Sequence, residues 1–241
     1  MKFNLITIAA GIIGFAVVRM FGFYGIGATL VTAPILMYVM IYAANRYNFR
    51  SSIKLEPIPA KGYETRIAYL NANEQLYFHL GFRKIDEFFL KTSHEVVAYV
   101  YRHEHFPLIF WDYDMQVVKF CDLVTRFDNG YSLTTSNGKN GGAFKREDAH
   151  LLQAFPSMPA DRLLEQHLQG VQFLNLREFH TSEEQTENYR ERFIEQFLEV
   201  GQKLTTPVAP VQMVYCMATN YKERHAKPIQ EQVLAKTVRM P

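Results

Sequence analysis

The pattern of apolar and polar positions divides the chain into two unequal parts. Residues 4–18 and 26–44 form two uncharged, largely apolar runs, whereas charged side chains recur throughout the sequence beyond them. Each run approaches the roughly 20 residues that a bilayer-spanning helix needs. The pattern therefore predicts a two-pass transmembrane hairpin over residues 1–44, turned by the glycine-rich and aromatic segment FGFYGIG.

Small residues in both runs would let the two membrane helices pack closely, namely Gly11, Gly14, Gly27 and Ala28. Basic residues without an acid follow the second run, so the positive-inside rule predicts a multi-pass membrane protein with its N-terminus and its remaining domain in the cytoplasm. Two alternatives stay open, a single tilted or broken span and a cleaved secretory signal.

Beyond the hairpin, residues 45–66 are polar, contain two prolines and predict a juxtamembrane linker. Residues 67–80 predict a helix that ends at Gly81. Short connections without room for crossover helices favour an antiparallel meander, and Asp128-Asn129-Gly130 predicts a hairpin turn. The predicted strands, rich in β-branched and aromatic residues, are 82–90, 95–101, 107–113, 117–127 and 131–136.

Helical periodicity returns after Phe155, with one apolar stripe between Leu163 and Leu174. A capping box at 181–184 predicts a second helix, whose apolar face consists of Tyr189, Phe193, Phe197 and Val200. The predicted fold is α+β: the hairpin, then a cytoplasmic domain over 67–204 with four to five strands and two or three helices. Residues 205–241 predict a proline-interrupted, basic C-terminal arm.

Charge and cysteine usage narrow the function classes. The net charge of +2 resides in the first 44 residues, which hold two basic residues and no acid, so the remaining chain is formally neutral. This balance argues against a nucleic-acid partner. The two cysteines, Cys121 and Cys216, lack the spacing of a metal site and the density of a disulfide scaffold, so we expect both to be reduced and buried.

Residues 73–90, NEQLYFHLGFRKIDEFFL, resemble the "N…LY…LGF" segment of the acyl-CoA N-acetyltransferase superfamily. The resemblance implies a helix and strand beside the cofactor, with a tyrosine that can act as an acid. The family's glycine-rich pyrophosphate loop should precede this segment, but residues 45–72 contain only Gly62. Without that loop nothing would hold the phosphates, so the sequence predicts no cofactor.

Two other motifs are too sparse to predict catalysis. His103-Glu104-His105 offers two metal ligands at strand spacing, but no third ligand follows at a diagnostic distance and Pro107 indicates a turn. Cys121 lies among apolar residues, which favours an inert core thiol over a nucleophile. We therefore predict no metal site and no catalytic residue, which makes an enzyme the less favoured class.

The segment from Ser132 to Gly142 carries hydroxyls at alternating strand positions into a glycine-rich loop. Such a loop can present N–H groups and a cation to an anion, although it does not match the P-loop motif and a solvated connection is the alternative. The candidate anion-binding residues are Arg126, Thr134, Ser136, Lys139 and Lys145.

The sequence thus favours a membrane-anchored accessory or scaffolding protein, in contact with lipid and a membrane-protein complex, with homo-oligomerisation left open. The alternative is a tethered domain that binds or acts on an anionic small molecule or lipid headgroup near residues 132–145.

Overall fold

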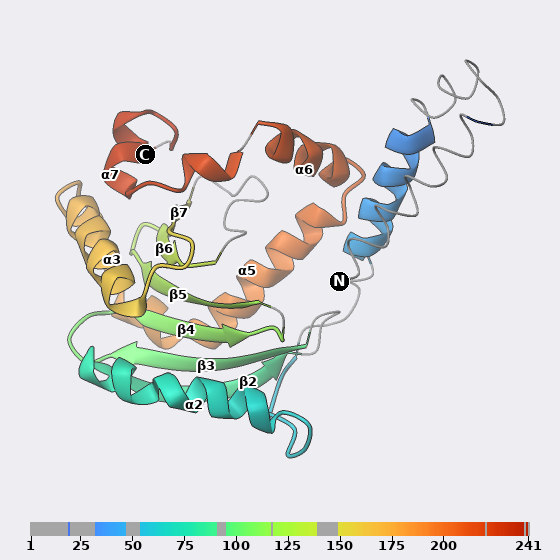
Figure 1. The fold of residues 1–241 in the computed structure, drawn as a ribbon. Helices are drawn as coiled ribbons and strands as arrows, with labels where there is room; N and C mark the ends of the chain where they lie inside the picture. The colour runs from blue at the N-terminus through green and yellow to red at the C-terminus, as the bar shows by residue number, and fades with distance from the viewer. Residues whose placement is uncertain are drawn as a thin grey trace.

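Seven strands form one sheet in the part of the chain that the computed structural model describes, which is residue 19 and residues 32–46, 54–90, 95–116, 118–138, 149–219, 221–238 and 240. The strands follow one another in sequence order across the sheet (Figure 1). Neighbours are antiparallel except β6 and β7, which are parallel. The strands are β1 (Leu55–Glu56), β2 (Phe82–Leu90), β3 (Val96–His103), β4 (Ile109–Asp114), β5 (Lys119–Arg126), β6 (Ser132–Ser136) and β7 (His150–Ala154).

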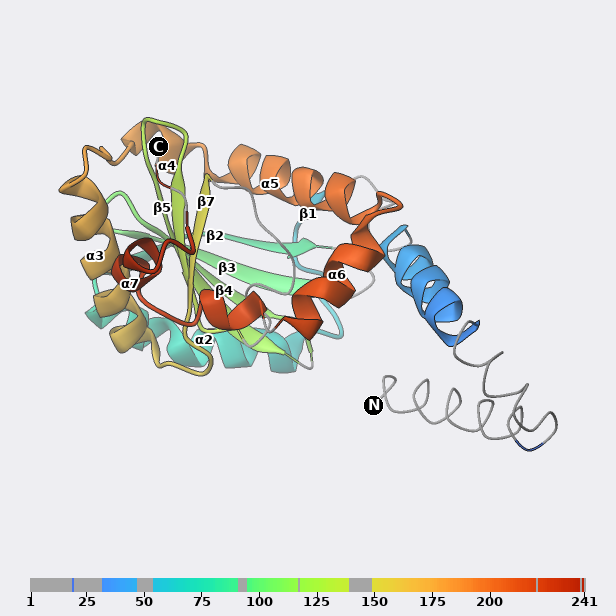
Figure 2. The same ribbon diagram turned by 90° about the horizontal axis from the view of Figure 1, so that it is seen from above.

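Helices cover both faces of the sheet. Figure 2 shows the sheet between α2 on one side and α5 on the other, with α6 next to a helix over residues 32–46. The labelled helices are α2 (Glu64–His79), α3 (Ala160–Asn175), α4 (Glu183–Glu187), α5 (Tyr189–Leu204), α6 (Ala209–Ala218), the 3₁₀ helix η1 (Tyr221–Arg224) and α7 (Ile229–Leu234).

Local sequence signals explain the helix end and the turn that frame the meander. Gly81 follows α2 with φ +85° and donates its N–H to the carbonyl of Phe78, which confirms the predicted stop. Gly130 adopts φ +81° between β5 and β6, and the Tyr131 N–H donates to the side chain of Asn129. The predicted hairpin at 128–130 is therefore confirmed.

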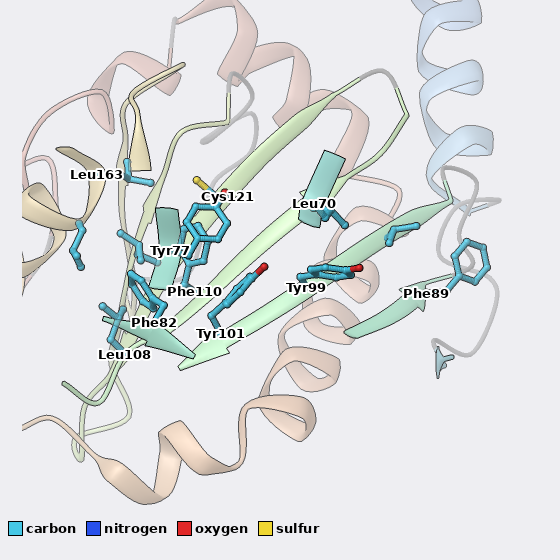
Figure 3. Packing of buried hydrophobic residues seen from close by; sticks show 13 residues of the cluster. Leu70, Tyr77, Phe82, Phe89, Tyr99, Tyr101, Leu108, Phe110, Cys121 and Leu163 are labelled. Atoms are coloured by element: carbon cyan, nitrogen blue, oxygen red, sulfur yellow. The ribbon is translucent and has the colours of Figure 1, made fainter. Parts of the chain in front are cut away.

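Aromatic side chains fill the interface between the sheet and α2. Tyr77 of α2 lies edge-on to Tyr101 and Phe110, with ring centroids 5.2 and 4.6 Å away (Figure 3). Leu163 brings α3 into the same cluster, which also contains Cys121. Burial of this many large rings is the main source of stability on this face.

A buried histidine ties α3 to the sheet. The His167 ring lies 2.9 Å from the Thr125 hydroxyl and 2.8 Å from the Thr135 hydroxyl. Gln153 donates to Thr135 and accepts from the N–H of Ile229 in α7. Burial lowers the pKa of His167 to about 3, so the ring stays neutral within this network.

The membrane prediction is wrong. Among the described residues no helix is both long enough and apolar enough to cross a bilayer. This finding contradicts the two-pass hairpin over 1–44, and with it the transmembrane fold class and the multi-pass localisation. The first run, 4–18, and the packing residues Gly11, Gly14, Gly27 and Ala28 lie outside the described residues.

The described part of the second run, residues 32–44, belongs to a helix over 32–46, and this helix contacts the C-terminal region. The Tyr38 hydroxyl donates to the carbonyl of Pro207 at 2.9 Å, and the Asn45 amide lies 3.5 Å from the sulfur of Met213. Hydropathy averages do not register such polar contacts, and this is the physical reason why hydropathy predicts a membrane span for this run.

The predicted sheet also needs correction, because it is larger and mixed. The five predicted strands correspond to β2–β6, but β1 and β7 extend the sheet at its two edges, and β7 pairs in parallel with β6. The predicted capping box places the cap at Thr181, whereas Ser182 caps α4 and Asn188 separates α4 from α5. Residues 205–241, predicted as an arm, contain α6, η1 and α7, with Ile229 buried.

Candidate functional site

A cavity of about 160 Å³ lies between α5 and the face of the sheet formed by β4, β5 and β6. Eight of its fourteen lining residues are aromatic or aliphatic and six are polar, a mixture that suits a small-molecule site. The lining residues are Ile109, Trp111, Tyr113, Asp122, Val124, Arg126, Thr134, Gln185, Thr186, Tyr189, Phe193, Gln196, Phe197 and Val200.

Strand alternation places the polar groups of this cavity. Asp122, Val124 and Arg126 are alternate residues of β5 and therefore point to the same face of the sheet. Val124 pairs with Ile109 of β4 and with Thr134 of β6, so these two side chains lie on that face as well. Asp122 and Arg126 are consequently separated along the strand by about 13 Å, with Val124 between them.

The first turn of α5 is fastened to β2 at an irregularity of the sheet. The β2–β3 register shifts between Lys84 and Asp86, as at a β-bulge. The Tyr189 hydroxyl donates to Asp86 at 2.8 Å, and Arg190 Nη2 donates to the same carboxylate at 2.6 Å. Burial acts to raise the pKa of Asp86, but these two donors hold it below its ordinary value. This clamp fixes the position of α5 over the sheet.

Stacked rings form one wall of the cavity. The Trp111 ring stacks on Phe193 of α5 with centroids 4.7 Å apart, and Tyr189 lies edge-on to Trp111 at 5.9 Å. Trp111 is the single tryptophan of the chain. Its fluorescence therefore reports on one position, which lies in the wall of the cavity and also packs against Phe88 of β2.

Arg126 is the cationic group of the cavity. Within the described residues its guanidinium makes no ion pair and no side-chain hydrogen bond. Burial lowers the pKa of Arg126 to about 10, with a further lowering by Arg192, while Glu195 and Glu199 act in the opposite direction. A charged group that is desolvated without a close partner is costly for a fold to keep, and such groups concentrate at binding and catalytic sites.

The structure brings two of the predicted anion-binding residues together, since Arg126 and Thr134 both line the cavity. Ser136 lies on the same strand as Thr134 but outside the lining, and its hydroxyl accepts from the N–H of Gly138. Lys139 and Lys145 lie outside the described residues.

Sequence reasoning missed the aromatic wall and the second charged group. The sequence predicts that Trp111 and Asp122 lie in strands but does not predict that they line a binding site. In the structure both side chains face α5. The signal that could have found them is the stripe of Phe193 and Phe197 on α5, which requires an apolar partner surface on the sheet.

The opposite face of the sheet holds a second, largely buried polar cluster. Burial raises the pKa of Asp112 to about 6, although the Tyr77 hydroxyl donates to it at 2.8 Å. Arg66 Nε donates to Asp114 at 2.9 Å, and Lys119 lies 3.4 Å from the same carboxylate. These groups join α2 to β4 and β5, so their role is to hold the layers together.

The remaining chemical candidates lie apart from the cavity. The His103 ring packs against Gly81, and its Nδ1 accepts from the N–H of His105. No group of three or more metal-ligating side chains occurs among the residues that the structure describes. Burial raises the pKa of the Cys121 thiol, which opposes formation of a nucleophilic thiolate.

Comparisons with known proteins add no constraint. No family model, no curated protein and no solved structure matches the chain. The geometry of the cavity is thus the basis for a functional proposal.

Proposed function

We propose that this domain is a binding module for a small organic anion, which enters the cavity under α5 and places its anionic group at Arg126. The carrying observation is that the Arg126 guanidinium is desolvated and has no ion-pair partner within the described residues. An anionic ligand would supply that partner and offset the desolvation of the charge.

The walls of the cavity support an organic rather than an inorganic ligand. Trp111, Phe193 and Phe197 present apolar surface beside the cation, and Thr134 adds a hydroxyl. Apolar walls with a few convergent polar groups are typical of sites that orient small molecules. The proposal also develops the alternative prediction of an anion site near residues 132–145, since Arg126 and Thr134 belong to both.

Trp111 fluorescence tests the proposal in the full-length protein. Benzoate, hexanoate and phenyl phosphate are titrated at low ionic strength, each against a neutral counterpart: benzamide, hexanamide and phenol. We expect at least one anion to change the Trp111 emission saturably and more strongly than its neutral counterpart, because Arg126 distinguishes the charge.

The matched variants decide whether Arg126 is responsible. Arg126→Gln should abolish the preference for the anion, whereas Arg162→Gln, on the exposed surface of α3, should preserve it. No response to any of the three anions, or an equal response of the Arg126→Gln variant, would overturn the proposal.

Exposed apolar side chains favour a second candidate function, self-association as an accessory subunit. Ile35 and Leu36 on the helix over 32–46 are 56% and 55% exposed, and Val211 and Tyr215 on the neighbouring α6 are 59% and 60% exposed. Apolar patches of this kind commonly mark protein contacts. A second copy of the chain is the partner that we propose, in line with the homo-oligomer that the sequence left open.

Sedimentation equilibrium tests this second candidate. The wild-type protein should form a species larger than the monomer, and Val211→Glu should dissociate it. Leu176→Glu, a change at an isolated leucine that is 79% exposed at the end of α3, should leave the association unchanged. A monomer at every concentration would contradict this candidate and would leave the ligand proposal unaffected.

A further inference from the structure

Charged side chains of α5 contribute to the electrostatic field at the cation of the cavity. Glu195 and Glu199 both act electrostatically on Arg126, as does Arg192. Glu195 is paired with Arg192 at 2.8 Å, and Glu199 lies 3.5 Å from the His150 ring. Since the Arg192 charge is balanced by Glu195, the field that a ligand meets at Arg126 is that of one cation beside one carboxylate.

This charge balance discriminates between anions. A phosphate monoester carries between −1.5 and −2 charges near neutral pH, whereas the described residues that line the cavity include one guanidinium to offset the removal of those charges from water. A carboxylate carries one negative charge, and its two oxygens match the fork of a guanidinium. Glu199 repels both kinds of anion, and the repulsion grows with the charge of the ligand, although water screens it because the Glu199 side chain is 50% exposed.

The far end of the cavity holds an acidic residue. Asp122 lines that end, about 13 Å along β5 from Arg126. Val124 lies between the two charges with Thr134 opposite it on β6, and Phe193 and Phe197 of α5 add apolar surface. A ligand therefore needs one anionic end at Arg126 and an uncharged, mainly apolar body.

The volume limits the size of that body. A cavity of about 150 Å³ is known to accommodate benzene, and the cavity under α5 measures about 160 Å³. One aromatic ring or a short aliphatic chain therefore fills it.

We infer that the ligand of this cavity is a monocarboxylate whose apolar part is the size of a single aromatic ring or a short acyl chain, and that phosphate esters are excluded. The inference rests on the proposed binding function and narrows it. Its basis is a cavity of this small volume whose described lining residues include one guanidinium and no second cation, so a second negative charge would be desolvated without a partner.

Isothermal titration calorimetry of the full-length protein at pH 8 and low salt tests the inference with benzoate, phenyl phosphate and benzamide. Benzoate should bind at least about tenfold more tightly than either of the others, because benzamide carries no charge for Arg126 and the second charge of phenyl phosphate leaves water without a second cation to pair it. Arg126→Gln should weaken benzoate binding at least about tenfold, and the surface control Arg162→Gln should leave it unchanged.

A charge variant tests the selectivity itself. Glu199→Gln removes the carboxylate of α5, so it should strengthen phenyl phosphate binding at least about twofold more than it strengthens benzoate binding. The control variant Glu165→Gln, on the exposed face of α3, should change neither affinity. Phenyl phosphate that binds wild type as tightly as benzoate does, or a Glu199→Gln variant with an unchanged ratio, overturns the monocarboxylate inference but not the binding function. Absence of binding by benzoate, hexanoate and phenyl phosphate alike overturns the two together.

Discussion

Replacing Arg126 by methionine should stabilise the protein while removing its capacity to bind organic anions. The pKa of Arg126 falls from 12.5 to about 10 in the folded protein. Since each pKa unit corresponds to about 1.36 kcal/mol, the charged guanidinium destabilises the folded state by roughly 3 kcal/mol relative to the unfolded state. The penalty is complete below pH 10, because the side chain is then charged in both states, and it is relieved only as the pH rises above that value.

Methionine retains the apolar stem of Arg126 and has no charge to desolvate. Partial solvent contact of the half-buried arginine reduces the penalty, so we expect a gain of about 1–2 kcal/mol in the free energy of unfolding. For a domain of this length that gain raises Tm by about 2–8 °C. Thermal unfolding followed by circular dichroism at pH 7 measures it directly, in the absence of added anions.

Arg102 provides the matched control, because it is a partly exposed arginine with ion-pair partners. Its guanidinium lies 2.9 Å from Glu183 and 3.5 Å from Glu187. Arg102→Met should therefore change the free energy of unfolding by less than about 1 kcal/mol, and not in the stabilising direction. A Tm for Arg126→Met clearly below that of wild type would refute the reasoning, since it would mean that protein groups already satisfy the Arg126 charge.

Three further predictions concern the framework of the site. Asp86→Asn should weaken the contact with Arg190 and lower the free energy of unfolding by about 1–2 kcal/mol. Hydrogen exchange of the α5 amides should become faster, whereas that of the α3 amides should not change. Equal protection of the α5 amides in the variant and in wild type would argue against a clamp. Gly170→Ala should destabilise by about 1–3 kcal/mol in urea unfolding, because an added Cβ would lie 2.9 Å from the Gln153 amide; stabilisation would contradict the close approach. Burial raises the pKa of Asp112 from 3.8 to about 6, so wild-type stability should lose roughly 3 kcal/mol as the pH rises through this window, and Asp112→Asn should flatten that profile.

The elements that sequence could predict are those with local signals. The strands β2 to β6 follow from dense β-branched and aromatic runs, and the hairpin at 128–130 follows from the conformational freedom of Gly130. β7 has no such local signal, because the sequence of His150–Ala154, HLLQA, does not alternate between apolar and polar residues. It forms a strand because it pairs with β6. Parallel pairing of this kind is a long-range contact that no local pattern encodes.

The cavity could be predicted only in part, for a related reason. Arg126 and Thr134 lie on the two strands of one hairpin, so a short stretch of sequence is enough to predict that they are close in space. Trp111 and Phe193 meet only after α5 crosses the sheet, and sequence periodicity does not specify which face a helix covers. The membrane prediction failed because hydropathy alone does not distinguish a lipid-facing helix from one that contacts the protein through groups such as Tyr38.

The central claim is that an organic anion occupies the space between α5 and β4–β6 with its charge at Arg126. Anomalous diffraction from crystals grown with 4-bromobenzoate tests this claim most directly, because bromine can be located independently of any assumption about the pose. The account predicts one dominant bromine peak among Trp111, Phe193 and Phe197, with the carboxylate density at Arg126. A dominant peak elsewhere on the protein, or a cavity without ligand density at a saturating concentration, would contradict it.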